Sequence, residues 1–242
     1  MKLFLVCFFL FSIHELVFSQ IDADSVAKFN FRFTVTYNWN TDIPGIQNRD
    51  EHRLKGSNEF SVKDKDVTSL KGMIATFTLL SANDYKALHL RFGKMMTGYQ
   101  YDVTAKETGI DGTVIGTVQT TIIERYTIYP FSVGAAFTTP KQDIQCFAEM
   151  VVALGNCDED YTIAATNGGT SRFSNSFTGN ALGYQCGIII SPKLSSAIAA
   201  HFEGGYRGLR FYEFENSKTK QVNSLELTLS CAFLNLGLSF IL

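Results

Sequence analysis

The sequence Lys-Phe-Asn-Phe-Arg-Phe-Thr-Val-Thr-Tyr-Asn-Trp at residues 28–39 decides the fold class. Aromatic and aliphatic side chains occupy every odd position of this stretch, and polar side chains occupy every even position. Successive side chains of a β-strand point to opposite faces of the sheet, so this strand has one apolar face and one polar face. A helix with the same pattern would mix both kinds of side chain around its surface.

The pattern leaves open which face points inward. In a soluble sandwich or a lipocalin-like barrel, the aromatic face forms the core. In a membrane barrel, the aromatic face meets lipid and the polar face fills the lumen. The remaining strands decide between these alternatives.

Seven further segments alternate in the same way and are predicted as strands. They are residues 73–79, 88–93, 117–137, 144–155, 182–190, 198–207 and 225–242. In the last segment the apolar residues change parity near Phe233, which predicts a β-bulge there. The total of eight strands is an even number, as in bacterial outer-membrane barrels.

The connections alternate between long polar segments and short turns. The long segments are 40–66, 102–116, 156–177 and 216–221, and the short turns are 81–84, 139–142 and 191–193. This alternation predicts all long loops on one rim and all short turns on the other. Small and uncharged polar residues predominate at the strand positions that alternate with the apolar ones. Such residues suit the crowded interior of a narrow barrel better than the water-exposed surface of a soluble protein. We therefore predict an all-β chain, an eight-stranded antiparallel up-and-down transmembrane β-barrel.

The N-terminus predicts export. Met1-Lys2 precedes an apolar run at residues 3–13 that is too short to span a bilayer as a helix. Val17-Phe18-Ser19 then supplies a cleavage site before Gln20, so residues 1–19 are interpreted as a signal peptide and residues 20–242 as the barrel domain.

The formal net charge of -2 gives no indication of nucleic-acid binding. The mature chain contains Cys146, Cys157, Cys186 and Cys231, whose spacing matches no zinc motif. We expect these cysteines to act as small apolar side chains on a buried or lipid-facing surface rather than as disulfides.

Strand parity places several charged residues in the lumen. The predicted polar network consists of Arg32, Arg91, Glu149, His201, Glu203 and Arg207. Isolated charges in so narrow a space would carry a large desolvation cost, so we expect arginines and glutamates to pair, with the partners left open. The alternative places Arg91 and Glu203 near the rims, in contact with bulk water.

Three motifs resemble a known group. Tyr129-Pro130-Phe131-Ser132-Val133-Gly134, His201-Phe202-Glu203-Gly204-Gly205-Tyr206-Arg207 and the segment 233–240 are similar to motifs of small bacterial outer-membrane β-barrel proteins, the broad group around OmpA and OmpX. The resemblance implies an outer-membrane location, contact with outer-membrane lipid, insertion by the barrel-assembly machinery and surface loops that meet a partner.

No constellation of residues indicates catalysis. His52 lies in the first long loop, while His89 and His201 point to the lumen, and no Gly-x-Ser-x-Gly elbow occurs. Asp158-Glu159-Asp160 could hold Ca²⁺, but a solvated loop is the simpler interpretation. We expect a non-enzymatic protein without cofactor or metal. The alternatives are a narrow porin-like channel for small solutes and a secreted lipocalin-like barrel with an apolar ligand.

Overall fold

The computed structural model describes residues 29–40, 60–81, 85–108, 110, 113–165, 168–220, 222–223 and 227–242. The expected signal peptide, residues 1–19, and His52 lie outside these ranges. Among the described residues, no helix is long and apolar enough to cross a membrane.

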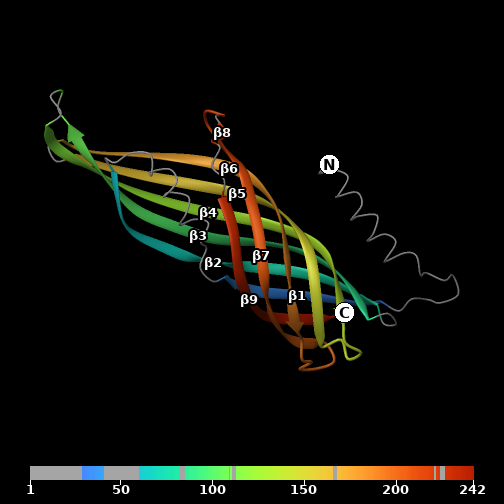
Figure 1. Ribbon diagram of the computed structural model, residues 1–242. Helices are drawn as coiled ribbons and strands as arrows, with labels where there is room; N and C mark the ends of the chain where they lie inside the picture. Colours follow the sequence, from blue (N-terminus) through green and yellow to red (C-terminus); the bar gives the residue numbers. More distant parts are fainter. Residues whose placement is uncertain are drawn as a thin grey trace.

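The described chain is a single antiparallel β-barrel (Figure 1). Its strands are β1 (Phe29–Asn40), β2 (Phe60–Ser81), β3 (Lys86–Thr108), β4 (Val114–Thr138), β5 (Ile144–Ala165), β6 (Thr170–Ile190), β7 (Ile198–Asn216), β8 (Val222–Asn223) and β9 (Leu227–Ile241). Each long strand pairs with its neighbours in sequence, and β9 pairs with both β7 and β1. The ring is therefore closed, and the two-residue β8 is an appendage that pairs with β7 alone in the described chain.

The two faces of the wall are chemically opposite. On β1, the outward side chains Phe31 and Trp39 are each 56% exposed, whereas the inward Thr34 and Asn38 are buried. The same belt continues around the ring with Phe77, Phe92, Phe131, Val152, Ile188, Phe202 and Leu236, all exposed. A continuous apolar exterior is unfavourable in water, whereas a barrel wall in contact with lipid is apolar on its outer face. The predicted eight-stranded up-and-down transmembrane barrel is confirmed.

Strands β2 to β6 continue beyond the end of β1 as a sheet that projects from one rim (Figure 1). We call residues 60–69, 97–108, 114–127, 156–165 and 170–177 the projecting sheet. The prediction of long loops is therefore wrong for residues 60–66, 102–108, 114–116, 156–165 and 170–177, which lie in paired strands. The remainder of the first predicted loop, residues 41–59, lies outside the described residues. Polar side chains such as Gln119, Arg125 and Asp158 occupy the described outward face of this sheet, and this polarity made the strands resemble loops in the sequence.

The bulge predicted near Phe233 is also wrong. Strand β9 pairs with β1 and β7 without a register shift at this position. Leu229, Cys231 and Phe233 all point inward and are buried. The apolar residues change parity because the barrel interior changes from polar to apolar along β9. Register shifts occur instead on β2, at the ends of β3 and β4, and between β6 and β7.

We predict that the cost of a new charge on the outer wall depends on its level. Val35→Arg places a guanidinium in the lipid belt and should destabilise the barrel by about 2–4 kcal/mol. Gln119→Arg, on the exposed outward face of the projecting sheet, should change stability by less than about 0.5 kcal/mol. Urea unfolding of protein refolded into lipid vesicles measures both. Equal tolerance at the two positions would contradict a lipid-facing belt.

Candidate functional site

The centre of the barrel holds an ion-pair network around Arg91. Inward-facing positions of β3, β5 and β7 supply Arg91, Glu149 and Glu203, which are all at most 3% exposed. The Arg91 Nη1 atom donates to Glu203 Oε1 at 2.6 Å. Its Nε atom lies 2.7 Å from Glu149 Oε1 but off the hydrogen-bonding direction, so this contact is an ion pair only. One guanidinium from β3 thus bridges two carboxylates, one from β5 and one from β7, which are separated in the ring by β6.

Glu149 gathers the polar groups of the neighbouring strands. Its Oε2 atom accepts from Ser132 Oγ at 2.7 Å and from Gln185 Nε2 at 2.6 Å. Its Oε1 atom lies 2.9 Å from His89 Nδ1, which also lies 3.2 Å from Arg91 Nη2. His89 Nδ1 can accept from Arg91 or, when protonated, donate to Glu149, but it cannot do both.

The second guanidinium, Arg207, is joined to this network through an amide. Its Nε atom donates to Gln185 Oε1 at 2.8 Å, and the same Gln185 side chain donates to Glu149. Its Nη1 atom contacts Met95 Sδ at 3.0 Å and lies 3.4 Å from Asn38 Oδ1. Arg207 therefore has no direct carboxylate partner among the described residues, and one intervening amide separates it from Glu149.

Two further predicted residues lie nearer the short turns. His201 Nε2 is 3.2 Å from Glu203 Oε2, and its Nδ1 atom is 3.3 Å from Ser239 Oγ. Arg32 donates from Nη2 to the backbone carbonyl of Gln142 at 3.3 Å, in the turn between β4 and β5. Arg32 is thus buried beside a turn and stands apart from the central ion pairs.

The structure places all six predicted lumen residues inside the barrel and joins five of them in one connected network. The alternative position of Arg91 and Glu203 near the rims is wrong, since the two side chains are only 2% and 1% exposed. The sequence reasoning missed the neutral members Ser132, Gln185 and Asn38. Their inward parity was visible, but nothing in the sequence showed that β4 and β6 would bring them to Glu149.

Aromatic rings flank the charged network on the inner wall. The Arg91 guanidinium carbon lies 4.5 Å from the centroid of the Phe147 ring, and that of Arg207 lies 4.7 Å from the centroid of Phe233. Stacking of this kind stabilises a guanidinium that has lost its water. The two arginines are thus held by rings as well as by polar groups.

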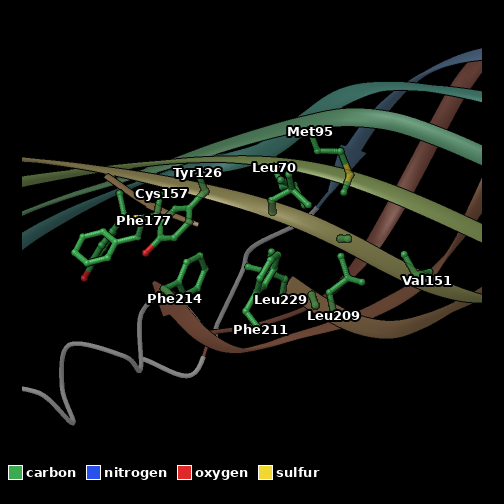
Figure 2. Packing of buried hydrophobic residues seen from close by; sticks show 14 of the residues in the cluster. Leu70, Met95, Tyr126, Val151, Cys157, Phe177, Leu209, Phe211, Phe214 and Leu229 are labelled. Carbon is green, nitrogen blue, oxygen red and sulfur yellow. The ribbon is translucent and has the colours of Figure 1, made fainter. Parts of the chain in front are cut away.

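Apolar clusters lie on both sides of the network. The sheet-side cluster fills the lumen toward the projecting sheet. Figure 2 shows its labelled side chains, which come from strands β2 through β7 and from β9 and point toward one another. Its largest members include Tyr99, Tyr101, Tyr126, Phe177, Phe211 and Phe214. The turn-side cluster contains Leu80, Ala87, Ala136, Phe147, Ile189 and Phe233. An apolar lumen was not predicted, because the inward positions of the strands were expected to be polar throughout.

Glycine is required where an inner ring touches the wall. A Cβ atom at Gly155 would lie 2.5 Å from the Phe211 ring, closer than any real contact allows. Gly155 faces Gly179 across the β5–β6 pair, and a Cβ atom at Gly179 would lie 3.0 Å from the Phe214 ring. The packing of Phe211 and Phe214 in the sheet-side cluster therefore depends on these two glycines.

The acidic triplet at 158–160 does not converge on one point. Asp158 and Asp160 lie on the outward face of β5, where they accept from Ser176 and Ser174 respectively, while Glu159 is buried on the inward face. Hydrogen bonds from Ser174 and Arg125 hold the pKa of Asp160 below its ordinary value. Strand alternation therefore separates Glu159 from the other two carboxylates, and no metal-binding cluster occurs among the described residues.

The cysteines occupy both faces of the wall. Cys146 and Cys186 are exposed toward the lipid side, whereas Cys157 and Cys231 are buried inside, and no disulfide joins any of these four described cysteines. Cys231 Sγ donates to Asn40 Oδ1 at 3.3 Å. The expectation of small apolar side chains rather than disulfides agrees with this placement.

Fold, belt and charged lumen together define an outer-membrane β-barrel protein, and a barrel with such a belt resides in an outer membrane. Similar solved structures include Ail, the attachment invasion locus protein of Yersinia pestis, in complex with the heparin analogue sucrose octasulfate. This chain is 12% identical to it, with a TM-score of 0.42 over 89% of this chain and 99% of that one. OprG of Pseudomonas aeruginosa is 12% identical, with a TM-score of 0.33 over 89% and 97% of the two chains.

The outer-membrane protease OmpT of Escherichia coli is also similar, at 7% identity and a TM-score of 0.33 over 91% of this chain and all of that one. No protein-family model matches the chain, and no curated protein matches it. The assignment of the fold class rests on the register and the exposed belt of this chain itself.

We predict that the central charges are coupled. Glu203→Gln leaves Arg91 with one carboxylate in a buried site and should destabilise the barrel by about 3–5 kcal/mol. The double variant Arg91→Met, Glu203→Gln restores the balance between Arg207 and Glu149 and should cost clearly less than the sum of the two single variants. Urea unfolding in vesicles gives all three values. Additive effects would show that these side chains do not act as one network.

Proposed function

We propose that this chain is a non-enzymatic outer-membrane protein whose barrel is an anchor and whose projecting sheet is an interaction surface at the cell exterior. The observation that carries the proposal is the extension of five neighbouring strands, β2 to β6, beyond the end of β1. A barrel that only closed a membrane wall would not need strands of 21 to 25 residues, since about 9–11 residues span a bilayer.

The projecting sheet is rigid rather than loop-like. Cross-strand bonds fasten its outward face: Arg125 pairs with Asp160 at 2.5 Å, and Thr121 donates to Asp102 at 2.6 Å. Its inward face continues the sheet-side cluster through Tyr126 and Phe177. A stiff sheet loses little conformational freedom when it binds, which favours recognition by shape.

One edge of this sheet is open within the described residues. Residues 170–175 of β6 pair with β5, whereas pairing of β6 with β7 begins only at Phe177. An open edge offers backbone donors and acceptors to an incoming strand. A partner that adds an extended segment to β6 is therefore the kind of partner that this geometry favours.

The orientation follows the general rule for such barrels, in which short turns face the periplasm and the longer segments face outward. The turns that join β4 to β5 and β6 to β7 are short, and they lie at the rim opposite the projecting sheet. This orientation places the open edge of β6 outside the cell.

The packing of the lumen supports an anchor over the alternative of a narrow channel. The sheet-side and turn-side clusters lie on either side of the ion pairs, and the cavity beside Arg91 and Arg207 has a volume of about 10 Å³. Such a space holds about one water molecule. The lipocalin-like alternative requires an apolar interior and a polar exterior, and the buried charges and exposed belt contradict it.

We predict that the projecting sheet can be shortened without loss of the barrel. Residues 161–173 are replaced by an Asn-Gly turn that joins Asp160 to Ser174, because these two residues are register partners and a two-residue turn fits between them. The shortened protein should still resist SDS until it is boiled, but cells that display it should lose adherence to polypeptide-coated surfaces, because the open edge of β6 is absent.

Cells carrying the full-length protein and cells carrying an empty vector are the two references for this adherence assay. Adherence of the full-length strain no greater than that of the shortened strain or the vector strain would contradict an interaction role for the sheet.

A further inference from the structure

Two lysines interrupt the lipid-facing belt on adjacent strands. Lys71 of β2 and Lys94 of β3 are both exposed and point outward. Lys71 lies opposite Met96 and Lys94 lies opposite Met73 in the β2–β3 register, so the two lysines are diagonal neighbours. Diagonal neighbours on one face of a sheet are about 7–8 Å apart, within reach of one small anion for side chains of this length.

Aromatic residues flank the lysine pair on both sides. Trp39 of β1 is the direct register partner of Lys71 and is 56% exposed. The Nζ atom of Lys94 lies 6.0 Å from the centroid of the Tyr129 ring. Exposed Trp and Tyr side chains mark the level of the lipid headgroups on membrane barrels. The lysine pair therefore lies where the hydrocarbon belt gives way to headgroups.

The register gives the same level independently. Pairing between β1 and β2 ends at Trp39 and Lys71, and beyond this point β2 continues into the projecting sheet. Met73 and Phe92, which are the next outward residues toward the short turns, are apolar and exposed. Lys71 is thus at the upper margin of the belt.

No described residue supplies a counter-charge for the positive charge at this margin. Neither lysine forms an ion pair with a described residue, in contrast to Arg91 inside the barrel. The described outward side chains of β1 to β4, from the turns up to this level, include no carboxylate. Two neighbouring ammonium groups without a counter-charge favour an external anion at this place.

We propose that Trp39, Lys71, Lys94 and Tyr129 form a site for the phosphate of an anionic lipid headgroup in the outer leaflet. The occupant is a membrane lipid rather than a soluble anion because the four side chains point sideways from the wall, next to lipid-facing Met73. The ammonium groups neutralise the phosphate, and the rings of Trp39 and Tyr129 pack on the glycerol and upper acyl region. The site is independent of any partner of the projecting sheet.

Trp39 is a built-in reporter, because it is the only tryptophan of the chain. Protein refolded into phosphatidylcholine nanodiscs is compared with protein in nanodiscs containing increasing fractions of phosphatidylglycerol, and the fluorescence of Trp39 is recorded. We expect a saturable change in emission. Lys71→Gln and Lys94→Gln should each raise the half-saturating fraction of phosphatidylglycerol about fivefold, and the double variant should raise it by more than either.

The matched control is Lys141→Gln, since Lys141 is an exposed lysine in the turn between β4 and β5 at the other rim. It should leave the titration unchanged, and heat-modifiable mobility in SDS confirms that each variant is folded. Equal titrations for Lys141→Gln and the double variant would overturn the site. Displacement of the Trp39 signal by inorganic phosphate at the same concentration as the lipid would overturn the assignment to a headgroup.

Discussion

The ion pairs of Arg91 with Glu149 and Glu203 are the interaction on which the rest of the lumen depends. A closed ring with lipid outside leaves inward charges no bulk water, so each charge must find a partner across the lumen or carry its desolvation cost. Arg91 meets two carboxylates, and Gln185 connects Arg207 to the same group through Glu149. Ser132 and Gln185 of the surrounding strands donate further hydrogen bonds to Glu149.

The same closure explains the division of the interior into layers. The ion pairs of the described lumen lie in the middle of the barrel, and an apolar cluster lies on each side of them. On the sheet side the filling extends beyond the end of β1, so that β2 to β6 remain ordered where the ring no longer supports them. Anchor and interaction surface are thus one continuous sheet with one continuous core.

The belt and the inward positions could be predicted from the sequence because they depend on strand parity alone. Phe31 and Trp39 face out and Arg32 faces in, as the alternation at residues 28–39 requires. The projecting sheet could not be predicted in the same way. Above the membrane the outward face of a strand can be polar, so Asp158 and Asp160 had the appearance of a loop although they lie on β5.

The error at Phe233 has a related cause. Apolar residues of a barrel strand were expected to face lipid, whereas Leu229, Cys231 and Phe233 belong to the interior. The partners in the ion pairs could not be predicted from the sequence either, because the distance between Arg91 and Glu203 depends on the shear of the whole ring. Parity gives the direction of a side chain, and only closure of the ring gives its partner.

The central claim is that the exposed belt of this closed barrel meets the lipid of an outer membrane. Cell fractionation combined with gel mobility in SDS tests it most directly. The account predicts that the protein is in the envelope fraction and that it migrates as a compact species in SDS until it is boiled, after which it migrates more slowly. Recovery in the soluble fraction, with the same mobility before and after boiling, would contradict the account.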